Sequence, residues 1–571
     1  MKLILKYIRR HIRMFLTAIF FLTLETIAEL LQPTFMSYIV DKGVKSRSVD
    51  WILLYGGIML GIAALGALGA VMRNIYASRT SQRIGKEMRS EIYGKIQTLS
   101  FENIDRLQPA SLITRITNDV TQIQNFINGS MRIMMKVPII CVGAITLIIL
   151  QTPQQLPVLL VIICISGVLI WLNMRLGYPR FGRMQGKLDR LNEVSREFLS
   201  SIRVVKAFHA EEQEEEKFAE ASGEFAAAGI SAMRVLAVFS PLINLTVNLG
   251  IVILLLLSGR QDAGEIGKLM ASINYMTQVL FALGMITHIL NSAVRAVASS
   301  KRVEEVLREE PAQKLPLDPV EIDIKGEIAF LHTTFSYDGT SMPALEDISF
   351  TVNPGETIGI IGPTGSGKST LVNLIPRFYD PTKGEVRIDG SEIRQIDTDL
   401  LRHAISVVPQ KALLFSGTIA QNLRWGKEDA TDEELQTAIR IACADEFISG
   451  FPAGLDTRLN QGGVNLSGGQ KQRLSIARAL MRRPKILILD DCTSALDAST
   501  GAEALKALEE EVAHMTVLLI SQRISTVMNT DRVLCMEEGQ IRGFGTHEDL
   551  LESCPAYQAI YQSQIGGEQN G

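Results

Sequence analysis

The stretch TIGIIGPTGSGKSTLVNLI, residues 357–375, decides the fold of the C-terminal half of the chain. Its first five residues are small or apolar, a pattern typical of a buried strand, and the residues after Ser369 follow a helical pattern. The loop between them has the spacing GxxxxGK[ST], in which glycines let backbone N–H groups curl around phosphate groups at a helix N-terminus. We therefore expect a phosphate-binding loop made of Gly362, Pro363, Thr364, Gly365, Ser366, Gly367, Lys368, Ser369 and Thr370.

The side chains of this loop and of a later strand predict a nucleotide site that contains a metal ion. Lys368 should reach the outer phosphates, and the hydroxyl of Ser369 should bind Mg²⁺. A second apolar run, Lys485–Leu489, predicts a strand that ends at Asp490, whose carboxylate can hold the same ion. ATP and Mg²⁺ are therefore the expected cofactors.

The bulk composition indicates two large units, one of them strongly apolar. A chain of 571 residues exceeds what a single hydrophobic core usually holds. The chain is 47% hydrophobic although 21% of its residues are charged, so the apolar residues must be concentrated in one part. The net charge of -4 does not indicate a nucleic-acid partner, and the cysteines have neither a CxxC pair nor metal-ligand spacing.

The N-terminal part predicts an α-helical transmembrane domain with six spans, over residues 1–310. A helix that crosses the hydrocarbon core of a bilayer needs ~20 mostly apolar residues. Apolar segments of that length lie at residues 14–39, 51–76, 131–152, 156–176, 234–258 and 268–294. Residues 1–12 are basic and apolar, which predicts an amphipathic helix at the membrane surface. From residue 326 to residue 571 the chain alternates strands with helices, as in an α/β domain with a largely parallel sheet.

The connections between the apolar segments predict the orientation of the chain. Two of them, between the second and third segments and between the fourth and fifth, are long and rich in arginine and lysine. The positive-inside tendency places both connections, the N-terminus and the C-terminal domain in the cytoplasm of a cell whose plasma membrane the chain spans. Each long connection should turn in a short helix, near residues 101–112 and near residues 207–216.

Several polar residues lie inside the apolar segments: Glu25, Glu29, Asn244, Asn248, Asn274, Gln278, His288 and Asn291. Such groups either hydrogen-bond neighbouring helices or line a wet cavity for a substrate, and the sequence leaves both explanations open. Arg132 and Lys136 lie near the end of the third segment, from which long basic side chains can extend toward the membrane surface.

One further motif narrows the class of the nucleotide domain. LSGGQ (residues 466–470), followed by KQRLSIARAL, resembles the signature sequence of ABC-transporter ATPases. Other family elements follow the expected order: Tyr337 in FSYDG, Gln410 in VVPQ and Asp497 in SALD. The resemblance implies that Tyr337 stacks on adenine and that Gln410 joins Ser369 and Asp490 at the Mg²⁺ ion. It also implies that Asp497 lies at a dimer seam and that Ser467, Gly468, Gly469 and Gln470 bind the γ-phosphate of ATP held by another subunit.

The resemblance covers nearly the whole chain and is closest to half-size exporters of the multidrug type. It implies ATP-driven efflux of amphipathic small molecules, drugs or lipids, by alternating access across the bilayer. It further implies that one short connecting helix docks on the nucleotide domain of its own chain and the other on that of a partner. Which molecule is transported does not follow from the sequence.

Two residues depart from the family pattern. Asp491 stands where a hydrolysing site has glutamate, and Gln522 stands where the family has a histidine that contacts the γ-phosphate. Together they resemble the degenerate half of heterodimeric bacterial exporters, which implies a partner half-transporter with glutamate and histidine at these positions. A homodimeric lipid or drug flippase with two slow sites is the alternative. A nucleotide-gated importer or sensor on the same fold is a third explanation, without positive support in the sequence.

Overall fold

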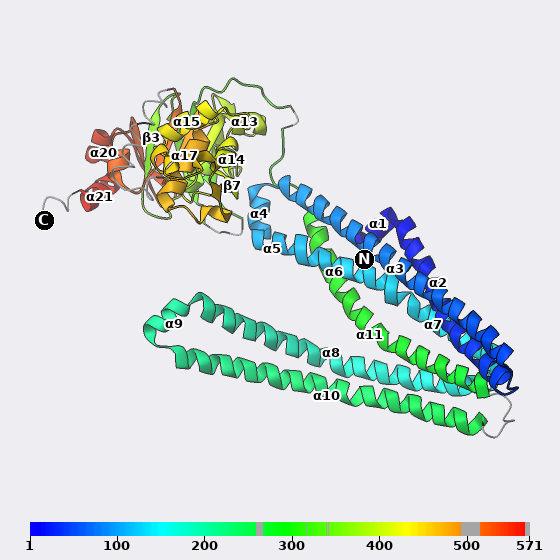
Figure 1. Cartoon of the computed structure of the whole chain (residues 1–571). Helices are drawn as coiled ribbons and strands as arrows, with labels where there is room; N and C mark the ends of the chain where they lie inside the picture. Colours follow the sequence, from blue (N-terminus) through cyan, green and yellow to red (C-terminus); the bar gives the residue numbers. More distant parts are fainter. Residues whose placement is uncertain are drawn as a thin grey trace. The chain divides into compact units, whose positions relative to one another are not determined.

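The computed structural model describes residues 1–258, 266–316, 318–338, 340, 342–492, 507 and 514–565. The chain forms two compact units. The first comprises Met1–Gln97 and Ala110–Arg308, and the second comprises Thr98–Pro109 and Glu309–Gly571 (Figure 1). A short piece of the N-terminal half thus belongs to the C-terminal unit, although residues 110–308 lie between it and the rest of that unit.

The described part of the first unit is helical. Its α-helices are α1 (Lys2–Arg10), α2 (Ile12–Tyr38), α3 (Val49–Gln97), α5 (Pro109–Thr114), α6 (Val120–Gly129), α7 (Lys136–Gln151), α8 (Leu156–Ser200), α9 (Ile202–Phe208), α10 (Glu211–Ser258) and α11 (Ile266–Arg308). Wider π-helical turns at Arg115–Asp119 and Ser130–Met134 join α5, α6 and α7 into one continuous run. Figure 1 shows α8 and α10 side by side, connected by α9 at one end.

Long apolar helices occur where the sequence predicts membrane spans. Within the described residues, five helical runs are long and apolar enough to cross a bilayer: Ile12–Val44, Val49–Gln97, Pro109–Gln151, Pro153–Ser200 and Glu211–Leu256. The sixth predicted span lies in α11, which is a helix of 43 residues but is not one of these five. The predicted helical transmembrane domain is therefore confirmed, and five of its six predicted spans overlap these runs.

The short connecting helices differ from the prediction in one case. The first, α4 (Phe101–Leu107), lies where it was expected. The second was expected near residues 207–216 and that prediction is wrong, because α9 spans Ile202–Phe208 and ends at His209, whose φ of 52° is left-handed. The acidic run that follows begins α10 instead, since carboxylates are favoured in the first turn of a helix, near the positive end of its dipole.

Buried charges connect three helices of the first unit. Glu25 of α2 forms ion pairs with Arg73 of α3 (Nε–Oε2 3.1 Å) and with Lys136 of α7 (Nζ–Oε1 3.2 Å). Lys136 also contacts Glu29 at 2.8 Å, so its side chain turns to the two acidic residues of α2. The acidic groups offer it partners inside the helix packing, which supports the helix–helix explanation for Glu25 and Glu29. The side chains of His288 and Asn291 lie outside the described part.

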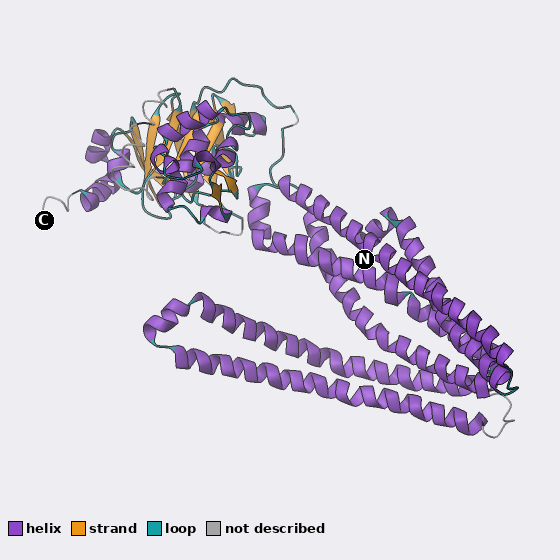
Figure 2. Ribbon diagram, in the orientation of Figure 1, coloured by secondary structure: helices purple, strands orange, loops and turns teal. Residues whose placement is uncertain are grey.

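The second unit combines two main sheets (Figure 2). The six-stranded sheet has the order β12-β11-β3-β10-β9-β6, and the four-stranded sheet has the order β2-β1-β4-β5. The strands are β1 (Ile328–Phe335), β2 (Leu345–Val352), β3 (Thr357–Ile361), β4 (Lys383–Ile388), β5 (Ser391–Glu392), β6 (Ile405–Val408), β7 (Gly417–Thr418), β8 (Arg458–Leu459), β9 (Ile486–Asp490), β10 (Thr516–Ile520), β11 (Arg532–Glu537) and β12 (Gln540–Gly545). The α-helices in the described part of this unit are α4, α12 (Lys368–Leu374), α13 (Thr398–Ala404), α14 (Ile419–Arg424), α15 (Asp432–Ile441), α16 (Asp445–Ser449), α17 (Gly468–Leu480), α19 (Ile524–Val527), α20 (His547–Ser553) and α21 (Pro555–Gln564).

The parallel strands of the larger sheet determine where the polar loops meet. β10 pairs in parallel with both β3 and β9, so that Ile520 lies beside Ile360 on one side and Asp490 on the other. These strands are continuous apolar runs because helices bury both faces of the sheet. The strand predicted to begin at Lys485 and to end at Asp490 is β9, which begins one residue later, at Ile486, and ends at Asp490. The antiparallel four-stranded sheet was not predicted.

The Glu25 ion pairs generate a stability prediction. Replacing Glu25 by alanine leaves the buried Arg73 without its carboxylate partner, whereas Lys136 keeps Glu29. Breaking a buried pair in this way costs ~3–5 kcal/mol. We expect the unfolding midpoint of the full-length protein in detergent to fall by several degrees in a thermal melt. Glu29→Ala is the matched control, because the Glu29 side chain is 41% exposed and its loss should change the midpoint little. Equal effects of the two changes would contradict the assignment.

Candidate nucleotide-binding site

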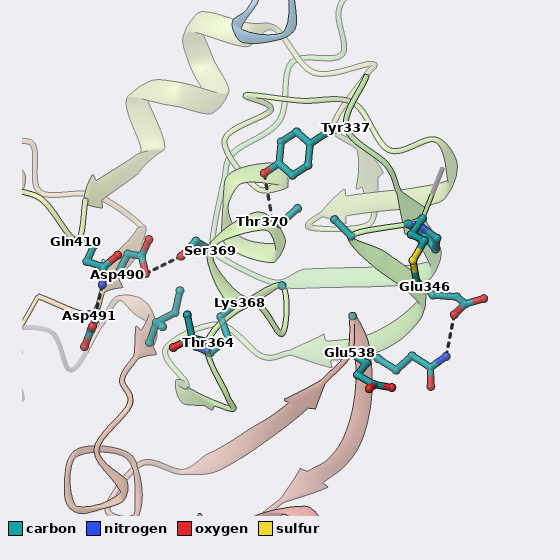
Figure 3. A pocket seen from close by; sticks show the side chains of 18 of the residues that line it. Tyr337, Glu346, Thr364, Lys368, Ser369, Thr370, Gln410, Asp490, Asp491 and Glu538 are labelled. Atoms are coloured by element: carbon teal, nitrogen blue, oxygen red, sulfur yellow. Dashed lines mark hydrogen bonds between the residues drawn. The ribbon is translucent and has the colours of Figure 1, made fainter. Parts of the chain in front are cut away.

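A cleft of about 770 Å³ lies at the edge of the six-stranded sheet where β3, β9 and β10 end (Figure 3). The residues that line it are Tyr337, Met342, Pro343, Ala344, Glu346, Thr364, Gly365, Gly367, Lys368, Ser369, Thr370, Gln410, Asp490, Asp491, Ile520, Gln522, Glu538, Gly539 and Gln540. Most residues that the sequence predicts for this chain's own site therefore meet in one cleft, although they come from separate parts of the unit.

The phosphate loop depends on two glycines that no other residue can replace without displacement of the backbone. Gly367 has a φ of 95° and directly precedes α12, and a Cβ there would lie 2.7 Å from the carbonyl oxygen of Ala344. At Gly362, a Cβ would lie only 2.1 Å from the carbonyl oxygen of Met536. The loop is thus pressed against neighbouring strands, and backbone N–H groups at the start of α12 are directed at the space that a phosphate would fill.

The ammonium group of Lys368 lies within the loop. Its Nζ donates hydrogen bonds to the carbonyl oxygens of Gly362 (2.8 Å) and Pro363 (2.7 Å). Burial lowers the pKa of Lys368, while the carboxylates of Asp491 and Asp490 act in the opposite direction. The cation is therefore held at the base of the cleft by neutral oxygen atoms, a position from which phosphate oxygens can attract it.

Ser369 and Asp490 form the part of the cleft that fits a magnesium ion. The hydroxyl of Ser369 donates a hydrogen bond of 3.1 Å to Oδ1 of Asp490. Burial raises the pKa of Asp490, and the neighbouring Asp491 raises it further, whereas Ser369 and Lys368 lower it. One hydroxyl and one carboxylate suit Mg²⁺, which usually keeps several waters and takes only one or two protein ligands beside phosphate oxygens.

Gln410, Asp491 and Gln522 form a hydrogen-bonded group beside this pair. The side-chain amide of Gln410 donates to Oδ2 of Asp491 at 3.1 Å, and the amide of Gln522 donates to the same oxygen at 3.4 Å. Asp491 is only 5% exposed and has a left-handed φ of 47°. Gln410, predicted to be a metal ligand, thus contacts Asp491 rather than Ser369 or Asp490 in this structure.

At the other end of the cleft, Tyr337 presents an aromatic ring next to the loop. Its hydroxyl lies 3.1 Å from Oγ1 of Thr370, and its ring contacts Tyr379 edge to face with the centroids 5.4 Å apart. A ring held in this way can stack on a flat heterocycle, as the sequence predicts for adenine.

The signature residues, Ser467 to Gln470, lie at the start of α17 and not in the wall of this cleft. Ser467 caps the N-terminus of α17: its hydroxyl accepts from the backbone N–H of Gln470 at 3.3 Å, and its own N–H donates to the Gln470 side chain at 2.9 Å. In the described part of the chain, neither Ser467 to Gln470 nor Gly362, Pro363 and Ser366 line the cleft. The capping box orders a helix end whose N–H groups are available to an anion from outside this cleft. Asp497 lies outside the described residues.

Sequence reasoning missed several residues of the cleft wall. Glu346, from β2, accepts a hydrogen bond of 2.9 Å from the side-chain amide of Gln540, from β12, and Glu538 lies in the turn before β12. Figure 3 shows Glu346 and Glu538 together beside the loop. No local motif marks these residues, because they reach the cleft only through the pairing of strands that are far apart in sequence.

The fold and the cleft define an ATP-binding membrane protein with one nucleotide domain for each transmembrane domain. A family model described as ABC transporter transmembrane region matches residues 15–283, and a second, described as ABC transporter, matches residues 345–494. The chain therefore belongs to the ABC transporter family.

Similar proteins extend over the whole chain. YfiB of Bacillus subtilis, an uncharacterized ABC transporter ATP-binding protein, is 38% identical over 554 residues and 96% of each chain. Rv1273c of Mycobacterium tuberculosis, which has the same description, is 39% identical over 578 residues and 98% of each chain. The ATP-dependent lipid A-core flippase of Thiobacillus denitrificans is 29% identical over 570 residues and 98% of each chain.

A solved structure has the same fold. A bacterial Atm1-family ABC exporter with ATP bound superposes with a TM-score of 0.78 over 99% of both chains, at 24% identity. The chain thus has the fold of an ABC exporter half-transporter, with a helical transmembrane domain followed by one nucleotide-binding domain.

The geometry of Lys368 generates a prediction about nucleotide binding. Lys368→Ala should weaken the binding of ATP to the full-length protein by about 10- to 100-fold, because hydrogen bonds to charged groups are worth ~1.5–3 kcal/mol. The measurement is the Kd of a fluorescent ATP analogue, with Lys383→Ala as the control, since Lys383 is exposed on β4 and outside the cleft. Unchanged affinity in Lys368→Ala would contradict the assignment of the loop.

Proposed function

We propose that this chain is the degenerate-site subunit of a heterodimeric exporter of amphipathic small molecules, drugs or lipids, in the plasma membrane. Its own site binds ATP with Mg²⁺ but hydrolyses it slowly, and hydrolysis takes place mainly at the partner's site. The observation that carries this proposal is the pair of amide donors, from Gln410 and Gln522, on one oxygen of Asp491.

Asp491 is poorly suited to activate water. A general base must lie within hydrogen-bond distance of the attacking water and offer it an oxygen. Aspartate is one methylene shorter than the glutamate of the family pattern, and a displacement of ~1 Å can cost ~10²-fold in rate. Two amides already bind Oδ2 of this carboxylate, and the residue is buried, which leaves it little freedom to move toward the water.

Gln522 supports the same conclusion from the phosphate side. Its side chain lines the cleft with Asp491, at the position where the family has histidine. A glutamine amide can donate a hydrogen bond to a phosphate oxygen, but it can carry neither a proton to be transferred nor a positive charge. Both groups that act on the reacting phosphate are therefore altered, while Lys368, Ser369 and Asp490 keep the chemistry needed to hold Mg-ATP.

The intact signature sequence favours a heterodimer in which this chain takes part in ATP hydrolysis at the partner's site. Ser467 and Gln470 order the N-terminus of α17, outside the cleft of this chain. In the proposed complex, this helix end binds the γ-phosphate at the partner's site, where the partner supplies glutamate and histidine. The nucleotide domain and the N-terminus are cytoplasmic. Closure of the two nucleotide domains turns the transmembrane cavity outward, and hydrolysis at the partner's site resets it.

A homodimeric lipid flippase is the second candidate. Two relatives named ATP-dependent lipid A-core flippase, from Thiobacillus denitrificans and Hahella chejuensis, are 29% and 30% identical to this chain over 98% of its length. In that case both sites of the dimer would contain Asp491 and Gln522, and both would be slow. The two proposals differ in whether a second half-transporter is needed for turnover.

Purification and a compensating variant test the proposal. The tagged chain, isolated from its native membranes, should bring a second half-transporter with it in equal amount. Replacing that partner's catalytic glutamate by glutamine should remove nearly all ATPase activity of the complex. Asp491→Glu combined with Gln522→His in this chain should then raise the remaining rate by about 100-fold, since the base regains its reach.

One control variant and two further outcomes decide between the proposals. Adding Lys368→Ala to the compensating variant should abolish the gain, because the restored site would lack its phosphate ligand. Robust ATPase activity of the chain purified without any partner would overturn the heterodimer and support the homodimeric flippase. Substantial activity after the partner's glutamate is replaced would mean that Asp491 acts as a base.

A further inference from the structure

Helix α4 packs directly on the nucleotide domain, since residues 98–109 belong to the second unit. The ring of Phe101 contacts that of Phe378, with centroids 4.7 Å apart. The side-chain amide of Asn103 donates to the carbonyl oxygen of Glu310 at 3.0 Å, and its oxygen accepts from the N–H of Ala312 at 2.9 Å. These contacts hold α4 but do not reach the nucleotide cleft.

A single tyrosine makes the connection to the cleft. The hydroxyl of Tyr379 donates a hydrogen bond of 2.6 Å to Oδ2 of Asp105, on α4. Burial raises the pKa of Tyr379, and so does the carboxylate of Asp105, so the hydroxyl remains a donor at neutral pH. Since the acceptor is a carboxylate, this is a charge-assisted bond, roughly twice as strong as one between neutral groups.

The ring of Tyr379 also contacts that of Tyr337, edge to face at an angle of 82°. Tyr337 lines the nucleotide cleft, and it also lines a second cavity of about 780 Å³ whose wall includes Glu102, Asp105 and Tyr379. The ring of Tyr337 thus separates the space expected for adenine from the space beside α4. A change in the tilt of this ring must be accommodated by Tyr379, because aromatic pairs have a preferred geometry.

We propose that Tyr379 is a positioning residue that reports occupancy of the adenine position to α4, through its ring contact with Tyr337 and its hydrogen bond to Asp105. This inference rests on the proposed function, ATP binding at this chain's own site, together with the predicted stacking of Tyr337 on adenine. The phosphate loop detects the triphosphate, and this second route detects the base. α4 transmits the signal because α3 ends at Gln97 and α5 begins at Pro109, immediately before and after it.

The test separates the base from the phosphates. Hydrogen–deuterium exchange of the segment 98–109 is measured in the full-length protein in lipid nanodiscs, without nucleotide, with Mg-ATP, or with magnesium tripolyphosphate, which has no base. Both ligands are used at saturation of the phosphate loop. We expect ATP to slow exchange in α4 by at least about 10-fold more than tripolyphosphate, the factor that corresponds to a hydrogen bond to a charged group.

Tyr379→Phe removes only the hydroxyl and should abolish this difference while leaving the Kd for ATP within about twofold. Asp105→Ala should have the same effect from the α4 side, and the double variant should add nothing, because both changes break one bond. Tyr561→Phe, a tyrosine of α21 outside both cavities, is the matched control and should behave as the unaltered protein.

The outcomes distinguish this inference from the function on which it rests. If Tyr337→Ala leaves unchanged the tighter binding of ATP than of tripolyphosphate, the assignment of Tyr337 to adenine fails. If Tyr337→Ala removes that difference in binding but Tyr379→Phe and Asp105→Ala leave the protection of α4 intact, only the role of Tyr379 is overturned. Equal protection of α4 by ATP and tripolyphosphate in the unaltered protein would also overturn it.

Discussion

The nucleotide site depends on the parallel pairing of β10 between β3 and β9. In this register the ends of all three strands lie at one edge of the sheet, so the loop after β3, Asp490 and Asp491 after β9, and Gln522 after β10 converge. A shift of one residue in any of these strands would turn its side chains to the opposite face of the sheet. The buried apolar strands therefore do more than stabilise the domain, because their register aligns the groups that we propose bind phosphate and metal.

The same convergence explains why the altered residues act as a unit. Asp491 and Gln522 are on different strands, yet Gln522 donates to Asp491 because their strands are adjacent. Gln410, which follows β6 on the far side of β9, adds the second donor. In the proposed function, a carboxylate with two amide neighbours suits a site that binds nucleotide and stays closed, whereas rapid hydrolysis needs an oxygen that can reach the water.

Outside the nucleotide site, ion pairs in the transmembrane unit hold helices together. Glu25 pairs with basic residues of two other helices, and its side chain is 7% exposed, so this carboxylate joins helices rather than facing a wet path. The second unit includes α4, and the connection from Tyr337 through Tyr379 to Asp105 joins the cleft to α4 by one contact between aromatic rings and one hydrogen bond. Binding and movement can be coupled in this way without a change in the phosphate loop itself.

The sequence by itself determined the features that depend on local geometry. The glycine spacing of residues 362–369 requires the phosphate loop, the apolar periodicity predicts the strands 357–361 and 516–520, and segment length predicts the long helices. It placed α9 wrongly, because an acidic run can begin a helix as readily as form the middle of one. Only the tertiary structure decided that Lys136 turns to Glu25, that Gln410 contacts Asp491, and that Glu346 joins the cleft wall. It alone brought together Tyr379 and Asp105, 274 residues apart, because such contacts depend on packing between distant elements, which no local pattern encodes.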